Sequence, residues 1–149
     1  MADIYSEIET EHDKHRNLLE RLVETSGDTT DRKALFTELK ADLTAHANAE
    51  EQTLYAALLE DSDTQEQARH SIAEHKTVDD LLEDLDETDF SNPGWLTNAK
   101  KLRHKLEHHM EEEEKDVFSI ARDALSEAEA DKLGADFRQR KAQELKDAA

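Results

Sequence analysis

The sequence predicts an all-α fold, in which four helices run up, down, up and down around a common core and a fifth, C-terminal helix packs against them. Aromatic residues make up 5% of the chain, which has three glycines and one proline, whereas sandwiches and barrels need frequent turns and β-favouring residues. Apolar residues recur at spacings of three and four, as in amphipathic helices. We therefore expect one domain over residues 1–149, with the bundle at about 3–125 and the C-terminal helix at about 127–146.

The first helix is expected at about residues 3–24. Its buried stripe contains two histidines and consists of Ile4, Ile8, His12, His15, Leu19 and Leu22. Gly27 can end this helix, because glycine readily adopts a positive φ, and the hydroxyl and carboxylate groups beside it can cap the next one.

The second helix is expected to run to about residue 60. Its stripe consists of Phe36, Leu39, Leu43, His46, Glu50, Leu54 and Leu58. A buried carboxylate without a partner is costly. Glu50 in this seam therefore indicates that a positive charge, such as a cation, lies nearby.

The third and fourth helices follow the same plan. A turn at residues 61–63 precedes the third helix, whose stripe is Ala68, Ile72, His75, Val78, Leu82 and Leu85. Asn92 can cap the fourth helix, roughly residues 93–125, with Pro93 at its first position. The stripe of the fourth helix is Leu102, Leu106, His109, Glu113, Val117 and Ile120.

The fifth helix is expected after a capping box at residues 126–129. We expect Leu133, Phe137 and Leu145 to pack across the bundle and the helix to carry no chemistry.

The two halves of the bundle are duplicated. The paired histidines of each half lie 34 residues apart, at 12 and 46 and at 75 and 109. His46 and His109 each open a His-x-x-x-Glu motif that continues with a second acid, two further residues, an aliphatic residue and an aromatic residue. His15 is an exception, because Val78 stands at the matching position.

This duplication predicts a metal centre. Residues four apart share one helix face, so each His-x-x-x-Glu pair can reach toward one point. Four imidazoles and two carboxylates suit iron or manganese, and two ions fit better than one because they can share both glutamates and keep a position open. The expected ligands are His12, His46, Glu50, His75, His109 and Glu113.

Other polar residues have more than one interpretation. His15 can be a hydrogen-bonded core histidine, a support for a ligand or a fifth nitrogen ligand. Tyr5 and Tyr55 lie near inward stripes and are core residues or, for one of them, a tyrosinate ligand. Trp95 is expected to pack on the bundle end. The remaining acids and histidines near the motifs lie outside the apolar stripes and are interpreted as surface groups. They are the pair His70 and Glu74, the pair His108 and Glu112, and the single residues His104, Glu111 and Glu114.

Composition excludes several classes of function. The formal charge of −19, from 38 acidic and 19 basic residues, disfavours nucleic acid and anionic membrane surfaces as partners. It leaves open adaptation to high salt or attraction of cations. The chain has no cysteine, which rules out disulfides, iron–sulfur clusters and thiolate nucleophiles. With no signal peptide and no membrane span in the sequence, we expect a cytoplasmic protein.

Over about residues 4–125 the chain resembles the hemerythrin-like proteins, or HHE cation-binding domains. The motifs that carry the resemblance are Glu11-His12, His46-x-x-x-Glu50-Glu51, Glu74-His75 and His109-x-x-x-Glu113-Glu114. The resemblance implies two non-haem iron ions with an oxo or hydroxo bridge. It further implies that Glu50 and Glu113 bridge the ions and that the four histidines are terminal ligands.

The chain departs from the oxygen-carrying hemerythrins at Ser71, where they have a histidine, and at Glu113, where they have a longer His-x-x-x-x-Asp motif. It therefore resembles the H-HxxxE-H-HxxxE type, which is associated with peroxide or nitric oxide handling, oxygen or iron sensing and stress response. We expect a di-iron protein that binds O2, peroxide or NO; both reversible binding and catalase- or peroxidase-like turnover fit. The alternative is an iron- or oxygen-responsive interaction module without catalysis. Iron rather than manganese rests on the resemblance alone, and the residues leave the oligomeric state open.

Overall fold

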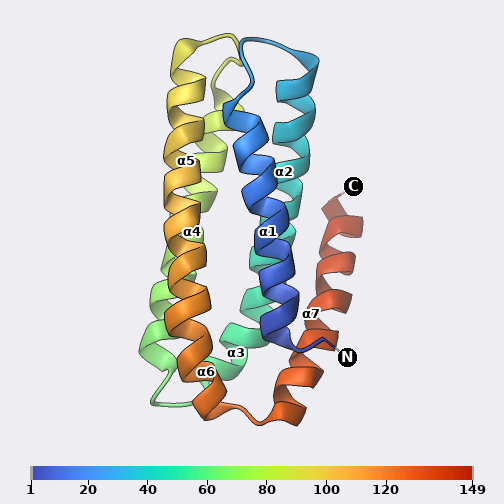
Figure 1. Cartoon of the computed structure of the whole chain (residues 1–149), viewed down its shortest axis with the longest axis vertical. Coiled ribbons are helices and arrows are strands. Elements are labelled where there is room, and N and C mark those ends of the chain that lie inside the picture. The colour runs from blue at the N-terminus through green and yellow to red at the C-terminus, as the bar shows by residue number, and fades with distance from the viewer. Residues whose placement is uncertain (1, 149) are drawn as a thin grey trace.

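The computed structural model describes residues 2–148, which form four antiparallel helical rods with a fifth helix alongside (Figure 1). The first rod is α1 (Ile4–Val23). The second rod consists of α2 (Thr30–Glu50), η1 (Glu51–Tyr55) and α3 (Ala56–Leu59), and the third is α4 (Gln65–Glu87). The fourth rod consists of α5 (Pro93–Glu112), η2 (Glu113–Val117) and α6 (Phe118–Ala124), and the fifth helix is α7 (Glu127–Ala148). The predicted all-α bundle is confirmed.

The turn chemistry explains where the helices begin and end. Gly27 has a φ of +60° in the loop between α1 and α2, a conformation that glycine adopts without strain. The Asn92 side chain accepts a hydrogen bond of 2.8 Å from the Gly94 backbone N–H at the start of α5. Ser126 and Glu129 cap each other's backbone N–H groups at 3.0 and 3.1 Å, which starts α7 as the capping box predicts.

Two apolar clusters fill the bundle, one toward each end. The cluster at the α1–α2 loop end includes Leu19, Leu39, Leu82 and Leu102, and its Trp95 ring is fully buried. The Trp95 indole N–H donates to the Leu85 carbonyl at 3.1 Å, so the expected place of this residue at the bundle end is confirmed. The opposite cluster consists of Ile4, Tyr5, Ile8, Ala49, Leu54, Tyr55, Leu58, Ala68, Val117, Phe118, Ala121, Ala130 and Phe137. The five buried histidines lie between the two clusters along their helices.

Helix α7 packs along α1 and α2 (Figure 1). Phe137 is buried and Leu133 is partly buried in the cluster that contains Ile4, as expected. The expectation for Leu145 is wrong: its side chain is 37% exposed near the end of the helix. Gly134 meets the N-terminal backbone so closely that a Cβ atom there would lie 2.6 Å from the Ala2 carbonyl oxygen.

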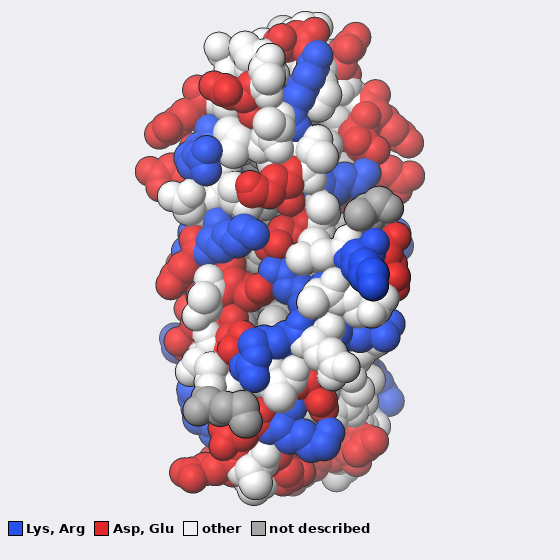
Figure 2. Space-filling view, turned by 90° about the vertical axis from the view of Figure 1, so that its right-hand side faces the viewer, with Lys and Arg blue, Asp and Glu red and all other residues white. Residues whose placement is uncertain are grey.

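The surface is not uniformly acidic. On the face that carries α7, Lys and Arg side chains are interspersed with Asp and Glu (Figure 2). Arg138 of α7 pairs with Glu7 of α1 at 2.6 Å, and Lys132 pairs with Asp136 at 2.8 Å. Among the described helices, none is both long and apolar enough to cross a membrane.

We predict that Gly134→Ala destabilises the protein by about 2 kcal/mol, because the new methyl group would overlap the backbone of residues 2–4 and push α7 outward. This loss should appear although alanine favours a helix over glycine by about 1 kcal/mol. Urea unfolding followed by circular dichroism measures it. Ala142→Ser, at an exposed position of the same helix, is the control and should change little. Equal stability of Gly134→Ala and the wild type would contradict the close approach.

Candidate metal centre

Six side chains from all four rods of the bundle meet in its interior. α1 provides His12, α2 provides His46 and Glu50, α4 provides His75, α5 provides His109, and η2 begins with Glu113. All six are buried, and the two glutamates are at most 1% exposed. The structure thus brings together the residues that the duplicated motifs predict.

Each glutamate stands between histidines of two different rods. Glu50 has one carboxylate oxygen 3.1 Å from His46 Nε2 and the other 3.0 Å from His75 Nε2. The two oxygens of Glu113 lie 3.0 Å from His12 Nε2 and 3.5 Å from His109 Nε2. The ligand atoms therefore form two groups, each within 4.8 Å, that share both glutamates: His12 with His46, and His75 with His109.

A wide turn starts directly after Glu50 and another starts at Glu113. Residues 51–55 and 113–117 form π-helical turns, which insert an extra residue into the helix and often occur at functional sites. Because of the extra residue, both Leu54 and Tyr55 in the second rod, and both Val117 and Phe118 in the fourth, face inward and are fully buried. A periodicity of 3.6 residues does not predict this. The repeated aliphatic-aromatic tail in both halves of the sequence was the available signal.

A second set of carboxylates holds the four histidines from outside. His12 Nδ1 lies 2.6 Å from Glu114, and the Nδ1 atoms of the other three histidines each lie 2.9 Å from a carboxylate oxygen. Donation of the Nδ1 proton directs the Nε2 lone pair toward the centre, as metal ligation requires. We call these acids the supporting carboxylates: Glu11 for His46, Glu51 for His75, Glu74 for His109 and Glu114 for His12.

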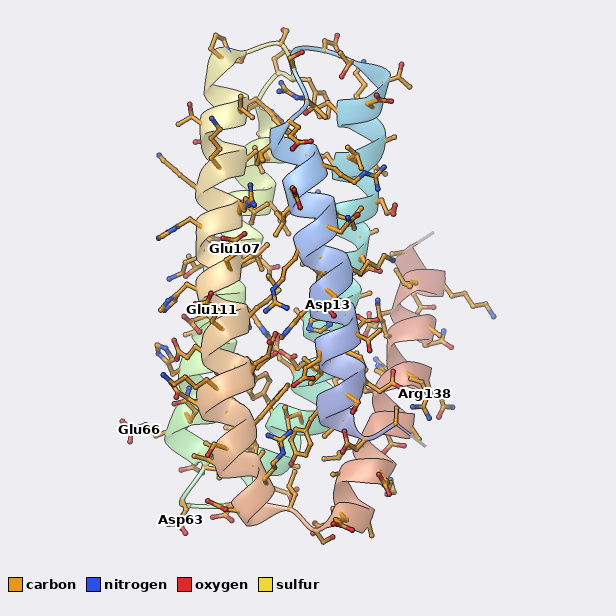
Figure 3. The ribbon with its side chains drawn as sticks, viewed as in Figure 1. Asp13, Asp63, Glu66, Glu107, Glu111 and Arg138 are labelled. Atoms are coloured by element: carbon orange, nitrogen blue, oxygen red, sulfur yellow. The ribbon has the colours of Figure 1, made fainter. Side chains whose placement is uncertain are left out.

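The assignment of two of these acids to the surface was wrong. Glu74 is 6% exposed, and Glu114 is partly buried between His12 and Arg16. Each supporting carboxylate directly precedes one of the four histidines or directly follows Glu50 or Glu113, and this neighbourhood is the same in both halves of the chain. That regularity could have identified them. Glu111, which was also assigned to the surface, is indeed exposed on α5 (Figure 3).

The chemistry of the buried atoms fits a pair of cations. Both oxygens of Glu50, one oxygen of Glu113 and Nε2 of His75 are buried without a hydrogen-bond partner among the described residues. With the Nδ1 atoms protonated, lone pairs of nitrogen and oxygen would face each other across about 3 Å, and only a proton or a cation between them makes that arrangement favourable.

In the absence of metal, protons supply the positive charge. Burial by itself lowers the pKa of His46, but the Glu50 carboxylate and the hydrogen bond to Glu11 outweigh it and raise the pKa to about 10. The pKa of His75 is likewise raised to about 9, because its contacts with Glu50 and Glu51 outweigh burial. Burial raises the pKa of Glu113, but His109 and His12 lower it well below its usual range.

His15 does not point its Nε2 atom at the centre. This atom lies 2.6 Å from Asp42, and the ring packs edge-on against His46 with centroids 5.0 Å apart. Burial outweighs the Asp42 contact and lowers the pKa of His15 to about 4, so a neutral imidazole donates to a carboxylate. Of the roles considered, the structure gives His15 that of a hydrogen-bonded core histidine beside His46.

Helix α7 reaches this side of the centre, contrary to the expectation that it carries no chemistry. The Lys141 ammonium group lies 2.9 Å from Asp42 and also contacts Glu11. The Phe137 ring packs edge-on against the His46 ring at 5.4 Å. A buried lysine on α7 therefore neutralises two of the acids that position His15 and His46.

The two tyrosines have different roles. The Tyr55 hydroxyl donates to Glu113, and burial followed by the Glu113 charge raises the pKa of Tyr55 well above its usual value, so this group remains a neutral donor. Tyr5 packs against Phe118 at 5.1 Å, and its buried hydroxyl has no hydrogen-bond partner among the described residues.

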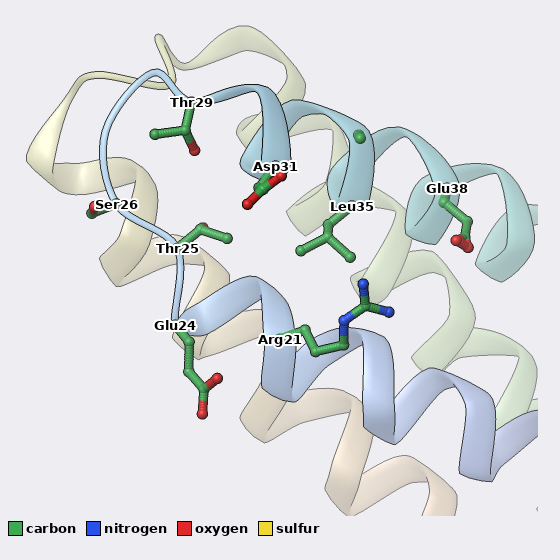
Figure 4. Close-up of a pocket in the computed structure, with 9 residues that line it drawn as sticks. Arg21, Glu24, Thr25, Ser26, Thr29, Asp31, Leu35 and Glu38 are labelled. Atoms are coloured by element: carbon green, nitrogen blue, oxygen red, sulfur yellow. The ribbon is translucent and has the colours of Figure 1, made fainter.

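The space beside the centre is small. A cavity of about 20 Å³ lies against the four histidines of the centre, with His15, Leu43, Val78 and Leu106 in its wall, and a volume of this order holds a water-sized molecule. A much larger hollow of about 540 Å³ lies near the α1–α2 loop (Figure 4). Arg21, Thr25 and Asp31 line that hollow, and none of the histidines does.

Comparisons with known proteins agree with this geometry. Residues 3–121 match the family model described as the hemerythrin HHE cation binding domain. A solved structure of a hemerythrin HHE cation binding domain-containing protein from Mycobacterium kansasii is similar, with a TM-score of 0.89, 28% identity, and coverage of 99% of this chain and 90% of that chain. A protein from Nostoc sp. strain PCC 7120 named DNA nickase is 28% identical over 139 residues. The match spans 91% of this chain but 38% of the Nostoc protein.

We predict that Lys141→Met destabilises the protein by about 3 kcal/mol, because it removes the buried ammonium group that Glu11 and Asp42 share and leaves the buried Asp42 with the half-exposed Lys14, at 3.2 Å, as its lysine partner. Lys132→Met is the matched control, since Lys132 is exposed and pairs with Asp136 within one helix turn. Urea unfolding of both variants gives the comparison. Equal effects of the two substitutions would show that Lys141 is not an internal charge partner.

We also predict that the metal-free protein becomes less stable as the pH rises from about 7 toward 10. His46 and His75 have a higher pKa in the folded protein than in the unfolded chain, so their stabilising protonation is complete below about pH 6.5 and is lost as the pH passes their folded pKa values of about 10 and about 9. Chemical unfolding across this pH range measures the loss. Glu50→Gln, which removes the charge between these rings, should flatten the dependence, and a flat profile for the wild type would contradict this account.

Proposed function

The chain belongs to the hemerythrin HHE cation-binding domain family, and from that premise we propose that it is a non-haem di-iron protein that binds and decomposes peroxide. The observation that carries the proposal is the sharing of Glu50 and Glu113 between two groups of ligand atoms. O2 and NO are further ligands of suitable size. A protein with this activity would act in the response to oxidative stress.

The donor set supports iron. His12 and His46 would hold one ion, His75 and His109 the other, and Glu50 and Glu113 both. Nitrogen and carboxylate oxygen donors without sulfur suit iron and manganese, and family membership favours iron. When bound, two iron ions would supply Lewis acidity and electrons for cleavage of an O–O bond.

The protein supplies position, exclusion of water and proton donors. The supporting carboxylates fix the tautomer and the orientation of each ring. The apolar clusters on both sides keep bulk water away, and the cavity of about 20 Å³ limits the ligand to a few atoms. Tyr55 holds a proton against Glu113, and His15 holds one against Asp42 in the wall of that cavity.

DNA cleavage is not part of this proposal. The chain spans 38% of the length of the Nostoc protein named DNA nickase, so the named activity can lie in the part outside the match. A formal charge of −19 also repels a phosphate backbone. The greater length of that relative does favour a second candidate, a domain that responds to iron or oxygen and passes the change to a partner.

The first test is the iron content and peroxide turnover of the protein purified under air. We predict about two irons per chain, near-ultraviolet absorption that changes when peroxide is added, and loss of both iron and turnover in Glu113→Ala. His104→Ala removes an exposed histidine and is the control, which should keep both. Turnover by the metal-free protein would refute the proposal. Two irons without turnover would favour the sensor candidate, in which removal of iron must also lower the melting temperature.

A further inference from the structure

A separate cluster of metal-ligating side chains lies on the outer side of α4 and α5. We call His70, Glu74 and Glu112 the outer cluster; one ligand atom from each lies within 4.8 Å of the other two. His70 Nε2 lies 3.0 Å from a Glu112 oxygen and 3.7 Å from a Glu74 oxygen. The sequence suggested two unrelated surface pairs, but the packing of α4 on α5 brings them into one group, which corrects that interpretation.

One separation in the outer cluster, 3.0 Å between His70 and Glu112, is that of two ligands on one ion, and the other, 3.7 Å to Glu74, is a few tenths of an ångström longer. Two donors about 2.1 Å from an ion lie roughly 3.0–3.4 Å apart in octahedral or tetrahedral geometry. Glu112 is held in place from a third direction, because His108 Nε2 lies 3.2 Å from its second oxygen. The His70 side chain is 55% exposed, so the cluster is open to solvent on one side and water can complete a coordination shell.

The duplication of the chain explains why Glu74 needs a charge partner. Glu74 and Glu11 occupy matching positions, and each accepts a hydrogen bond from a ligand histidine at 2.9 Å. Helix α7 provides Lys141 as the cation for Glu11. Glu74 lies on the opposite half of the bundle, is 6% exposed, and directs its second oxygen toward His70 instead of a lysine.

We propose that the outer cluster is a second metal site, which binds one divalent transition-metal ion such as Fe²⁺, Co²⁺ or Zn²⁺. One imidazole nitrogen and two carboxylates favour these ions over Mg²⁺ and Ca²⁺, which prefer oxygen donors alone. Two carboxylates balance the charge of such an ion, and the net charge of −19 raises the local concentration of cations.

The outer site is linked to the centre through one residue. One oxygen of Glu74 faces His70 and the other accepts from His109 Nδ1. An ion bound to Glu74 withdraws charge from the carboxylate that orients His109, so occupancy of the outer site acts directly on a ligand of the centre. This site requires neither iron in the centre nor peroxide turnover, and it therefore stands apart from the proposed function.

Cobalt binding to the protein as purified, with its native metal content, tests the proposal. Equilibrium dialysis against Co²⁺ gives the stoichiometry, and the visible absorption of bound Co²⁺ reports imidazole and carboxylate ligands. We expect one cobalt ion per chain that His70→Ala and Glu112→Gln lose or bind about tenfold more weakly. His104→Ala is the matched control, because it removes an exposed histidine of α5 outside the cluster, and it should bind as the wild type does.

Two results would overturn the outer site. One is that the wild type and His70→Ala bind the same amount of cobalt with the same affinity. The other is an equal loss in His104→Ala, which would mean that exposed histidines bind the ion without a built site. If the centre itself takes up cobalt, every variant gains the same extra ions, and the difference of one ion between the wild type and His70→Ala remains the readout.

Discussion

Two buried carboxylates, Glu50 and Glu113, impose the constraint on which the rest of the structure depends, because three of their four oxygens have no hydrogen-bond partner among the described residues. Both are at most 1% exposed, and an ionised carboxylate in such a place is stable only beside positive charge. The four histidines around them can supply that charge as imidazolium ions, or they can release their protons and hold metal ions, as we propose. The bundle therefore folds around a site whose charge either protons or metal must balance, which couples metal binding to protonation and to stability.

Charge alternates outward from this core. The imidazoles surround the two glutamates, and the supporting carboxylates surround the imidazoles. Basic side chains lie beside three of these carboxylates: Lys141 beside Glu11, Arg16 beside Glu114 and His70 beside Glu74. The two halves differ in this outermost set. In one half, the buried Lys141 of α7 lies beside Glu11. In the other half, the exposed His70 lies beside Glu74. The asymmetry separates the side of the centre that α7 covers from the side on which we propose the outer site.

The sequence alone predicted the helices, their approximate bounds and the group of six residues, because each depends on a short-range period or on an exact repeat between halves. Contacts between rods were not predictable in the same way. Glu74 and Glu114 look like ordinary surface acids when each helix is considered alone, and only their matching positions beside the motifs of both halves distinguish them. Lys141 comes from a helix outside the duplication, so no internal repeat pointed to it. The prediction for Leu145 was wrong for a simpler reason. Leu145 continues the helical spacing from Phe137, but near the end of α7 this spacing alone does not place it against the core, and it is 37% exposed.

The central claim is that the two shared glutamates hold two metal ions side by side. Anomalous diffraction at the iron absorption edge, from crystals of the protein loaded with ferrous iron, tests it most directly. The account predicts two anomalous peaks in each chain, both in contact with Glu50 and Glu113, one beside His12 and His46 and the other beside His75 and His109. A single peak in the interior, or none, would contradict it.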